Sequence, residues 1–353
     1  MELTLSTALA LLGGAVLLAL ALHGWWSTRR VRPRNVRGGD SLLPAERVEP
    51  ALDSATALVT ESTTLRAALR RSPPLDALID AIVPLQLDTP IAAELALQHL
   101  PPTRRAGSKP FYVEGQDAET GQWATIEAAE PGQRYSELQA GVQMASRSGA
   151  LNEIEYSEFV QKIEALAEAV GATVKWADAP DMLEVVARAR ELDGLANPLD
   201  AQLSVTLRSN GAAWSVAYVQ QVAARQGFVL GAVPGRLVLP SVEDGAPPML
   251  VLAVDSQAAL AEADQGPQAG AVRECTLTLD VPQTPAAAEP FPAWHRAATQ
   301  LAEDLDATAI DNNGEPITLH AYANIGNELQ SLYQQLEQLD LAAGSAAARR
   351  LFS

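Results

Sequence analysis

The sequence predicts an α+β protein in which one transmembrane helix precedes two similar domains, each a mostly antiparallel sheet with helices on one face. Three observations predict this class. The chain opens with an almost unbroken apolar run from Leu3 to Trp26. Beyond this run, segments that alternate between apolar and polar residues, typical of half-buried strands, are interleaved with segments of helical periodicity. The same order of strand and helix segments occurs twice, which indicates an internal repeat.

The amino-terminal run predicts a membrane anchor. Leu3 to Trp26 spans about 24 residues, enough to cross ~30 Å of hydrocarbon as a helix. Trp25 and Trp26 end the run, where amphipathic rings prefer the headgroup layer, and a series of arginines begins at Arg29 and Arg30. The positive-inside rule therefore places the amino terminus outside and the chain after Arg29 in the cytoplasm. A cleaved signal peptide would carry its basic residues before the run.

Composition narrows the classes of function. Of the 353 residues, 48% are hydrophobic, which suffices for the cores of two domains. The formal net charge of −18 argues against a nucleic-acid partner, because phosphate binding uses clustered lysine and arginine. A single cysteine, Cys275, excludes a disulfide framework and a thiolate zinc site. Cys275 is in phase with Leu277 and Leu279 in an alternating stretch, so we expect a small buried side chain there rather than a nucleophile.

Residues 27–74 predict a linker, because their arginines, glycines, prolines and small polar residues cannot bury much apolar surface. The repeat follows. Residues 166–174 and 301–309 share Leu, Ala, Glu, Ala and Thr at matching positions, and each segment ends an amphipathic helix. The strands expected before these helices are 138–144 and 275–281, and the helices expected after them are 181–192 and 323–339.

The second half of the chain defines its elements more clearly. Leu203, Val205 and Leu207 alternate with polar residues, which predicts a strand with one buried face. Such a mixture of antiparallel strands and helices leaves one face of the sheet to solvent or to a partner. The elements expected after this strand are a helix at 214–226, strands at 228–230, 236–239 and 249–254, an acidic loop at 261–270, a strand at 275–281, and helices at 292–305 and 323–339.

An ordered set of short motifs in this half resembles the ZipA family of inner-membrane proteins that bind the cell-division protein FtsZ. The matching residues are 226–231 (QGFVLG), 275–282 (CTLTLDVP) and 302–308 (AEDLDAT), and the likeness covers about 200–341 together with the anchor. The resemblance implies a role in septation as part of the divisome. The chain departs from the family in its shorter linker and in what resembles a second, degenerate copy of the domain at 75–198.

The resemblance also implies a binding site for the FtsZ carboxy-terminal tail. In the family, the uncovered sheet face forms a shallow apolar groove in which this tail docks mostly as a helix. The family has larger apolar side chains at several of these positions, with an aromatic expected in place of Thr278. Threonines are also ordinary residues of a strand that faces water, so both interpretations stay open. Mapped onto this chain, the peptide-binding residues are Thr206, Val233, Gly235, Leu250, Leu252, Thr276 and Thr278.

The alternation supports part of this assignment independently of the resemblance. If Leu277 and Leu279 point toward the helices, Thr276 and Thr278 must point away from them, because successive side chains of a strand face opposite sides. The same reasoning places Thr206 on the face opposite its apolar neighbours. The threonines are therefore expected on the uncovered face whatever the family.

The expected function is that of an inner-membrane-anchored cell-division protein that tethers FtsZ polymers at the septum, without catalysis, cofactor, metal or small-molecule substrate. Two alternatives stay open: an adapter for another complex that acts through 75–198, and a membrane-bound hydrolase built on Glu153, Glu155 and Glu158. For these three glutamates a helix start is the simpler explanation, because carboxylates interact favourably with the helix dipole there. The expected organisation is a periplasmic end at 1–2, a transmembrane helix at 3–26, a linker at 27–74, domains at 75–198 and 199–341, and a tail at 342–353.

Overall fold

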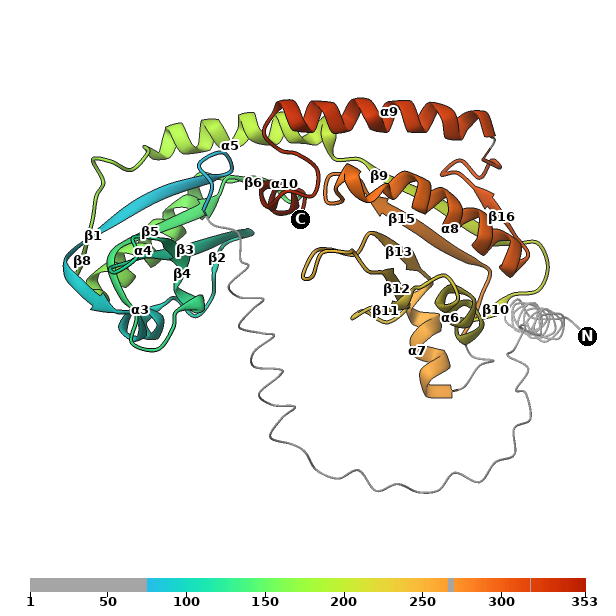
Figure 1. Ribbon diagram of the computed structural model, residues 1–353, viewed down its shortest axis with the longest axis horizontal. Coiled ribbons are helices and arrows are strands. Elements are labelled where there is room, and N and C mark those ends of the chain that lie inside the picture. The colour runs from blue at the N-terminus through green and yellow to red at the C-terminus, as the bar shows by residue number, and fades with distance from the viewer. Residues whose placement is uncertain (1–74, 266–269, 318) are drawn as a thin grey trace, which may run out of the picture. The chain divides into compact units, whose positions relative to one another are not determined.

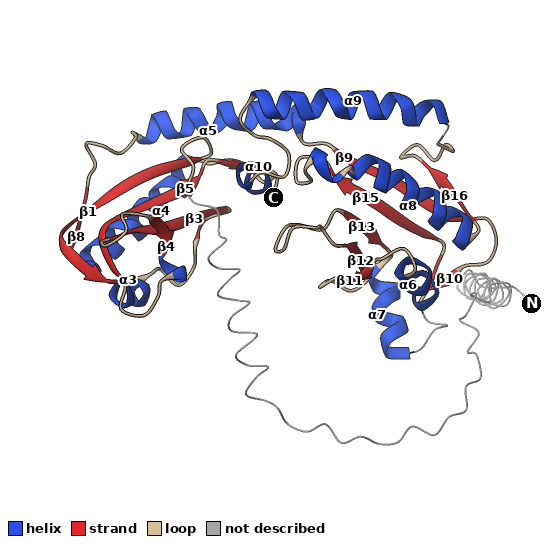
Figure 2. Cartoon of the chain, viewed as in Figure 1, coloured by secondary structure: helices blue, strands red, loops and turns tan. Residues whose placement is uncertain are grey.

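The computed structural model describes residues 75–265, 270–317 and 319–353, and it shows mixed α+β structure with antiparallel sheets (Figures 1 and 2). The predicted anchor, with Leu3, Trp25, Trp26, Arg29 and Arg30, and the predicted linker at 27–74 lie outside the described residues. Within the described ranges, no helix combines the length and the apolar character that crossing a bilayer requires.

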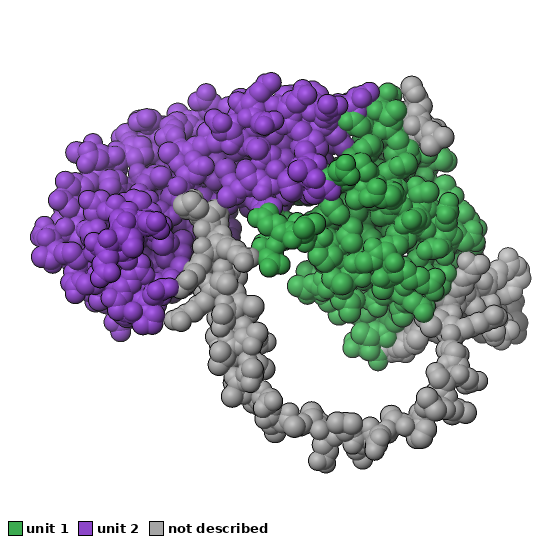
Figure 3. All heavy atoms as spheres, viewed as in Figure 1, with its two compact units in different colours: residues 1–42, 202–280, 289–326 green, residues 43–201, 281–288, 327–353 purple. Residues whose placement is uncertain are grey.

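The chain divides into two compact units (Figure 3). Of the described residues, unit 1 contains those of 202–280 and 289–326, and unit 2 contains those of 75–201, 281–288 and 327–353. The helix α9 (Leu319–Gln338) contributes residues to both units, since the division falls after Gly326. The last part of the expected 199–341 segment is thus grouped with the sheet formed by the first half of the chain.

Unit 2 is built around one antiparallel sheet with the strand order β2-β3-β5-β1-β8, in which β4 pairs with β3. Alternate residues of β1, from Ala81 to Leu87, are buried, as the period of two requires for a strand with one core face. The strands are β1 (Asp80–Ala92), β2 (Arg105–Ala106), β3 (Lys109–Asp117), β4 (Trp123–Thr125), β5 (Arg134–Gln143) and β8 (Ala172–Val174), with a small hairpin of β6 (Ala145–Ser146) and β7 (Gly149–Ala150).

Helix α4 (Glu153–Val170) closes the core of unit 2. Its Phe159 is fully buried and contacts Phe111 of β3 edge to face, with ring centroids 5.6 Å apart. Asn152 caps the start of α4 in a capping box with Glu155, and Gly171 ends the helix with a left-handed φ of 72°. Unit 2 also contains α3 (Ala93–His99), α5 (Met182–Ala196), α10 (Ala346–Leu351) and the part of α9 from Asn327 onward.

Unit 1 contains a second antiparallel sheet, with the strand order β11-β12-β13-β15-β9-β16. Helix α8 (Pro290–Leu305) packs on one face of this sheet, where the buried Trp294 donates its indole N–H to the carbonyl of Leu277 at 3.3 Å. The strands are β9 (Gln202–Ser209), β11 (Val229–Leu230), β12 (Arg236–Leu239), β13 (Leu250–Ala253), β15 (Glu274–Asp280) and β16 (Ala307–Ile310), with a separate pair of β10 (Trp214–Ser215) and β14 (Ala271–Val272).

Four strands of each sheet follow the same relative order along the chain, although the remaining strands of the two sheets are arranged differently. In unit 2 these four strands run β3-β5-β1-β8, and the edge strand β8 follows the long helix α4. In unit 1 they run β13-β15-β9-β16, and β16 follows the long helix α8. In both sheets the strand after the long helix therefore lies beside the first strand.

Two expected elements differ in part from the structure. Trp214 and Ser215, expected to begin the helix at 214–226, form strand β10, and the helix begins at Val216. Residues 261–265, expected in an acidic loop, belong to helix α7 (Ser256–Gln265). The carboxylate of Glu262 accepts hydrogen bonds from the backbone N–H groups of Val216 and Ala217, at 2.6 and 2.9 Å. The first N–H groups of a helix have no partner within the helix, and these two lie at the start of α6 (Val216–Ala224). Glu262 on α7 therefore caps α6. The composition of residues 261–270 shows that the segment is acidic, but it does not show that Glu262 bonds to the start of α6.

Candidate functional site: the open face of the unit 1 sheet

The candidate site is the side of the unit 1 sheet opposite α8, which we call the open face. Strand β15 fixes which residues belong to it, because Cys275, Leu277 and Leu279 are buried under the helices and the residues between them must face the other way. Thr276 and Thr278 are accordingly half-buried on the open face, and so is Thr206 on β9. The predicted placement of these three threonines is confirmed.

The predicted placement of Leu250 and Leu252 on this face is wrong. Both side chains are 0% exposed, and Leu252 lies opposite Leu277 in the register between β13 and β15. They therefore belong to the core face. All four residues of β13 are apolar, so the sequence offers no alternation that could set the phase of this strand, and only its pairing with β15 does so.

Val251 and Ala253 occupy the open face in place of the two leucines. The register carries one row across the sheet from Val229 through Val238 and Val251 to Thr278 and Ser204. The neighbouring row places Ala253 beside Thr276 and Thr206. We call the three valines and Ala253 the apolar half of the open face. Sequence reasoning missed these four residues, and the register is the only signal that finds them.

The other half of the open face is polar and internally paired. Four pairs of side chains hydrogen-bond across β9 and β15: Gln202 with Asp280 at 3.4 Å, Ser204 with Thr278 at 3.1 Å, Thr206 with Thr276 at 3.4 Å, and Arg208 with Glu274 at 2.6 Å. We call these eight residues the polar half. A guest side chain would have to compete with these bonds, so apolar contact is available mainly on the β11, β12 and β13 side.

The remaining predicted residues, Val233 and Gly235, lie in the turn between β11 and β12. Val233 is 49% exposed. Gly235 has a φ of 77°, and a Cβ there would lie 2.9 Å from the carbonyl oxygen of Val254. Gly235 also accepts a hydrogen bond from the Val254 N–H at 2.8 Å. Glycine is therefore needed at this position for the close approach of two backbone segments, and its contribution to the site is structural.

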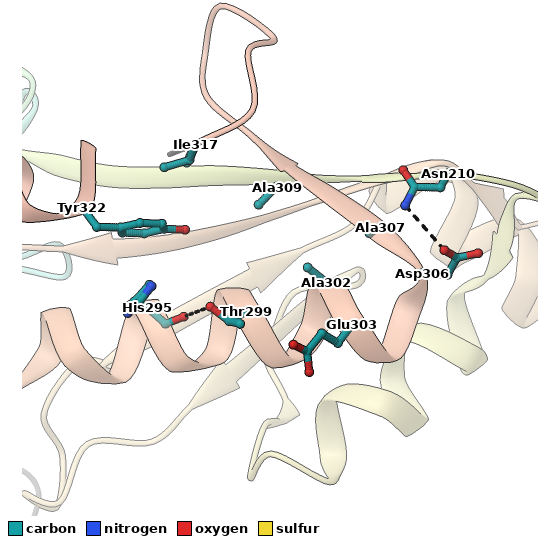
Figure 4. Close-up of a pocket in the computed structure, with 10 residues that line it drawn as sticks. All are labelled: Asn210, His295, Thr299, Ala302, Glu303, Asp306, Ala307, Ala309, Ile317 and Tyr322. Carbon is teal, nitrogen blue, oxygen red and sulfur yellow. Dashed lines mark hydrogen bonds between the residues drawn. The ribbon is translucent and has the colours of Figure 1, made fainter. Parts of the chain in front are cut away.

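A separate hollow of about 420 Å³ lies in unit 1 beside β16 (Figure 4). Ala302 of α8 and Ala307 and Ala309 of β16 line it, while the rings of His295 and Tyr322 stand at one end with centroids 4.1 Å apart. At the other end the Asp306 carboxylate accepts a 3.5 Å hydrogen bond from the Asn210 amide.

None of the predicted groove residues lines this hollow. Within the described residues, no group of three or more His, Cys, Asp or Glu side chains is placed to hold a metal ion.

The three glutamates considered for a hydrolase have structural partners in unit 2. Glu153 pairs with Arg190 at 3.0 Å, and Glu158 pairs with Lys162 at 2.7 Å. Glu155 is 8% exposed and accepts hydrogen bonds from the hydroxyl and the backbone N–H of Ser108. The prediction that this acidic segment is a helix start is confirmed, since α4 begins at Glu153.

Burial by itself would raise the pKa of the Glu155 carboxyl. The hydrogen bonds from Ser108 and Asn152, together with the charge of Lys109, outweigh burial and hold this pKa below its usual value. Lys109 itself is fully buried, and desolvation lowers the pKa of its amine, which is bonded to the hydroxyls of Ser146 and Ser148 at 3.0 Å each.

Two comparisons with known proteins bear on the identity of this chain. None of the protein-family models matches it. No curated protein matches its sequence either.

Proposed function

We propose that this chain is a membrane-anchored binding protein, without catalysis, that takes up the carboxy-terminal tail of FtsZ and tethers FtsZ polymers to the cytoplasmic face of the inner membrane at the septum. The apolar amino-terminal run and the likeness of residues 200–341 to the ZipA family support the proposal. The strand order common to the two sheets supports the further proposal that the units are tandem copies of one ZipA-like domain.

The observation that carries the proposal is the apolar half of the open face. Val229 is 49% exposed, and Val238, Val251 and Ala253 are half-buried, so water reaches the row of valines across three neighbouring strands. An amphipathic helix laid along this row would bury its own apolar stripe together with these side chains. Burial of apolar area is the main favourable contribution to such docking.

The apolar half is small, so each contact is expected to be weak. FtsZ in a polymer presents many tails, and many anchored copies of this chain would share one bilayer. Once one tail is bound, the next binding event takes place at a raised effective concentration, which converts weak single contacts into stable attachment. Recognition through apolar surface is also compatible with the formal net charge of −18.

The test uses the full-length chain in lipid nanodiscs and a fluorescent synthetic peptide of the FtsZ carboxy-terminal tail, with binding followed by anisotropy. We expect saturable binding to the unmodified chain. Val229→Asp and Val251→Asp each place a charge in the apolar half, and each should weaken binding at least ~10-fold. Val229→Asp is the milder change to the fold, because Val229 lies on an edge strand.

The matched control is Val242→Asp, since Val242 is 98% exposed in the connection between β12 and β13. This variant should bind the peptide as the unmodified chain does. Thermal unfolding of each variant separates loss of binding from loss of fold. Absence of peptide binding to the unmodified chain, or full binding by a folded Val229→Asp variant, would contradict the proposal.

A further inference from the structure

The sheet of unit 2 has a face that corresponds to the open face, on the side opposite α4. Alternation along β1 places Asp80 and Ile82 there, because Ala81 and Val83 are buried in the core. The register brings Gln143 of β5 opposite Asp80, and Gly141 of β5 opposite both Ile82 and Tyr112. We call this side of β1, β5 and β3 the covered face, because two segments of unit 2 lie on it.

The first covering segment is the carboxy-terminal helix α10. The Arg350 guanidinium forms a bidentate pair with the Asp80 carboxylate, in which the bond from Nη1 is 2.7 Å, and the two side chains are 7% and 0% exposed. The same guanidinium lies over the Tyr112 ring, 4.6 Å from its centroid. The Gln143 amide donates to the Arg350 carbonyl at 2.8 Å. Three adjacent strands therefore recognise one arginine of this helix.

Apolar side chains anchor α10 beside this arginine. Ala348, Leu351 and Phe352 are buried and belong to the hydrophobic core of unit 2. The Gln283 amide donates to the Phe352 carbonyl at 2.7 Å, and Ser345 caps the start of the helix through the N–H of Ala348 at 3.1 Å. The contact thus combines buried apolar side chains, hydrogen bonds that fix the position of the helix, and a charged pair. Helical peptides that dock on a protein surface use the same three kinds of contact.

The second covering segment begins at Leu75. Its side chain lies over Gly141, where a Cβ would be 2.6 Å from Cδ2 of Leu75, and its backbone N–H donates to Glu114 at 2.7 Å. In unit 2, β1 and β5 are paired from Asp80 and Gln143, and in unit 1, β9 and β15 are paired from Gln202 and Asp280. If these two pairs are taken as equivalent, Gly141 of β5 corresponds to Thr278 of β15 on the open face. Leu75 of unit 2 therefore covers the position that corresponds to Thr278, the residue next to the last valine of the row on the open face.

We propose that the covered face is a second helix-docking surface, selective for a short helix with an arginine in its last turn, and that α10 is its exchangeable intramolecular ligand. The β1, β5 and β3 strands pack against α4 on their other side, so most of the core of unit 2 is formed without α10. While α10 is bound, it closes this surface to any other helix of the same chemistry. The inference does not depend on FtsZ binding.

The test separates α10 from the chain only after folding. A recognition sequence for a site-specific protease is inserted after Ala342, which is exposed, and the full-length protein is purified and then cut. A fluorescent peptide of residues 343–353 is added in excess and followed by anisotropy, while native mass spectrometry counts the displaced segment. We expect saturable one-for-one exchange. A peptide carrying Arg350→Ala should bind about 100-fold more weakly, because the buried Asp80 carboxylate then keeps only its hydrogen bond from the Asp76 backbone N–H and loses its counter-charge.

Asp80→Asn in the protein should weaken binding of the unmodified 343–353 peptide to a similar degree. Asp88→Asn is the matched control, because Asp88 is an exposed aspartate on the same strand, and it should leave exchange unchanged. Circular dichroism of the cut protein reports its fold with and without peptide. If the cut segment never exchanges, if the body unfolds when the segment leaves, or if peptide binding does not depend on Asp80, α10 is a fixed part of the fold and the proposal is overturned.

Discussion

The hydroxyl groups of Ser204 and Thr278 lie 3.1 Å apart across β9 and β15, close enough for either to donate to the other. The pair stands at the end of the row that begins with Val229, Val238 and Val251. The row therefore changes from apolar to polar within one strand spacing, and this pair marks the boundary between the two halves of the open face.

Removing this boundary should strengthen tail binding. The double variant Ser204→Ala, Thr278→Val replaces both partners of a hydrogen bond with apolar groups, which is close to neutral for stability. It also extends the apolar row onto two further strands, β15 and β9, so we expect the affinity for the FtsZ tail peptide to rise about 3- to 10-fold in the anisotropy assay. Thr299→Val, on the exposed side of α8, should change nothing. Unchanged affinity in the double variant would show that the guest does not reach β15.

The Asp80 and Arg350 pair should dominate the stability of the carboxy-terminal segment. Asp80→Asn leaves a buried guanidinium without its counter-charge, and we expect the free energy of unfolding to fall by about 3–5 kcal/mol in urea denaturation. Replacing both partners with apolar residues, as in Asp80→Leu with Arg350→Met, should recover most of this loss. A loss below ~1 kcal/mol in Asp80→Asn would mean that the pair is not formed in solution.

Glu155 should make the free energy of unfolding fall at low pH. Its pKa in the folded protein is below the usual 4.5, so the folded state favours the charged carboxylate. The stabilisation is fully present above pH 4.5 and is lost as the pH falls through the lowered pKa of the folded state. Glu155→Gln should reduce the free energy of unfolding at neutral pH by about 1–2 kcal/mol and weaken this acid dependence. Denaturant titrations between pH 3 and 7 measure both, with Glu164→Gln, exposed on the same helix, as the control.

Cys275 should be unreactive while the protein is folded. The thiol is 2% exposed, and burial raises its pKa to about 12, so almost no thiolate is present at pH 8. A chromogenic disulfide reagent at pH 8 should label no cysteine in the native chain and one after denaturation in urea. Rapid labelling of the native protein would show that the core face of β15 opens readily. Cys275→Ala should leave a small cavity and cost about 1 kcal/mol.

Strand β15 and helix α8 show what local pattern can predict. Cys275, Leu277 and Leu279 alternate with polar residues, and this alternation correctly assigned both faces of the strand. Helix α8 was expected over 292–305 and spans Pro290–Leu305, because its apolar residues recur with the period of a helix. In both elements, the pattern of apolar and polar residues a few positions apart is enough to tell buried residues from exposed ones.

Strand β13 and the carboxy-terminal segment show where local pattern fails. Leu250 and Leu252 were assigned to the wrong face because every residue of β13 is apolar and the phase comes from the pairing with β15. Nothing near Arg350 in the sequence points to Asp80, which lies 270 positions away. The same is true of Glu262, whose partner is the start of a helix 46 positions earlier.

The sequence by itself therefore determined the α+β class, the extent of most helices and strands, and the faces of strands that alternate. Only the tertiary structure decided which apolar residues reach the open face, that its other half is a ladder of paired polar side chains, and that the matching face of unit 2 is covered by α10. The physical reason is range. Periodicity and capping act between residues a few positions apart, whereas register and buried ion pairs are fixed by contacts that form only when distant segments meet.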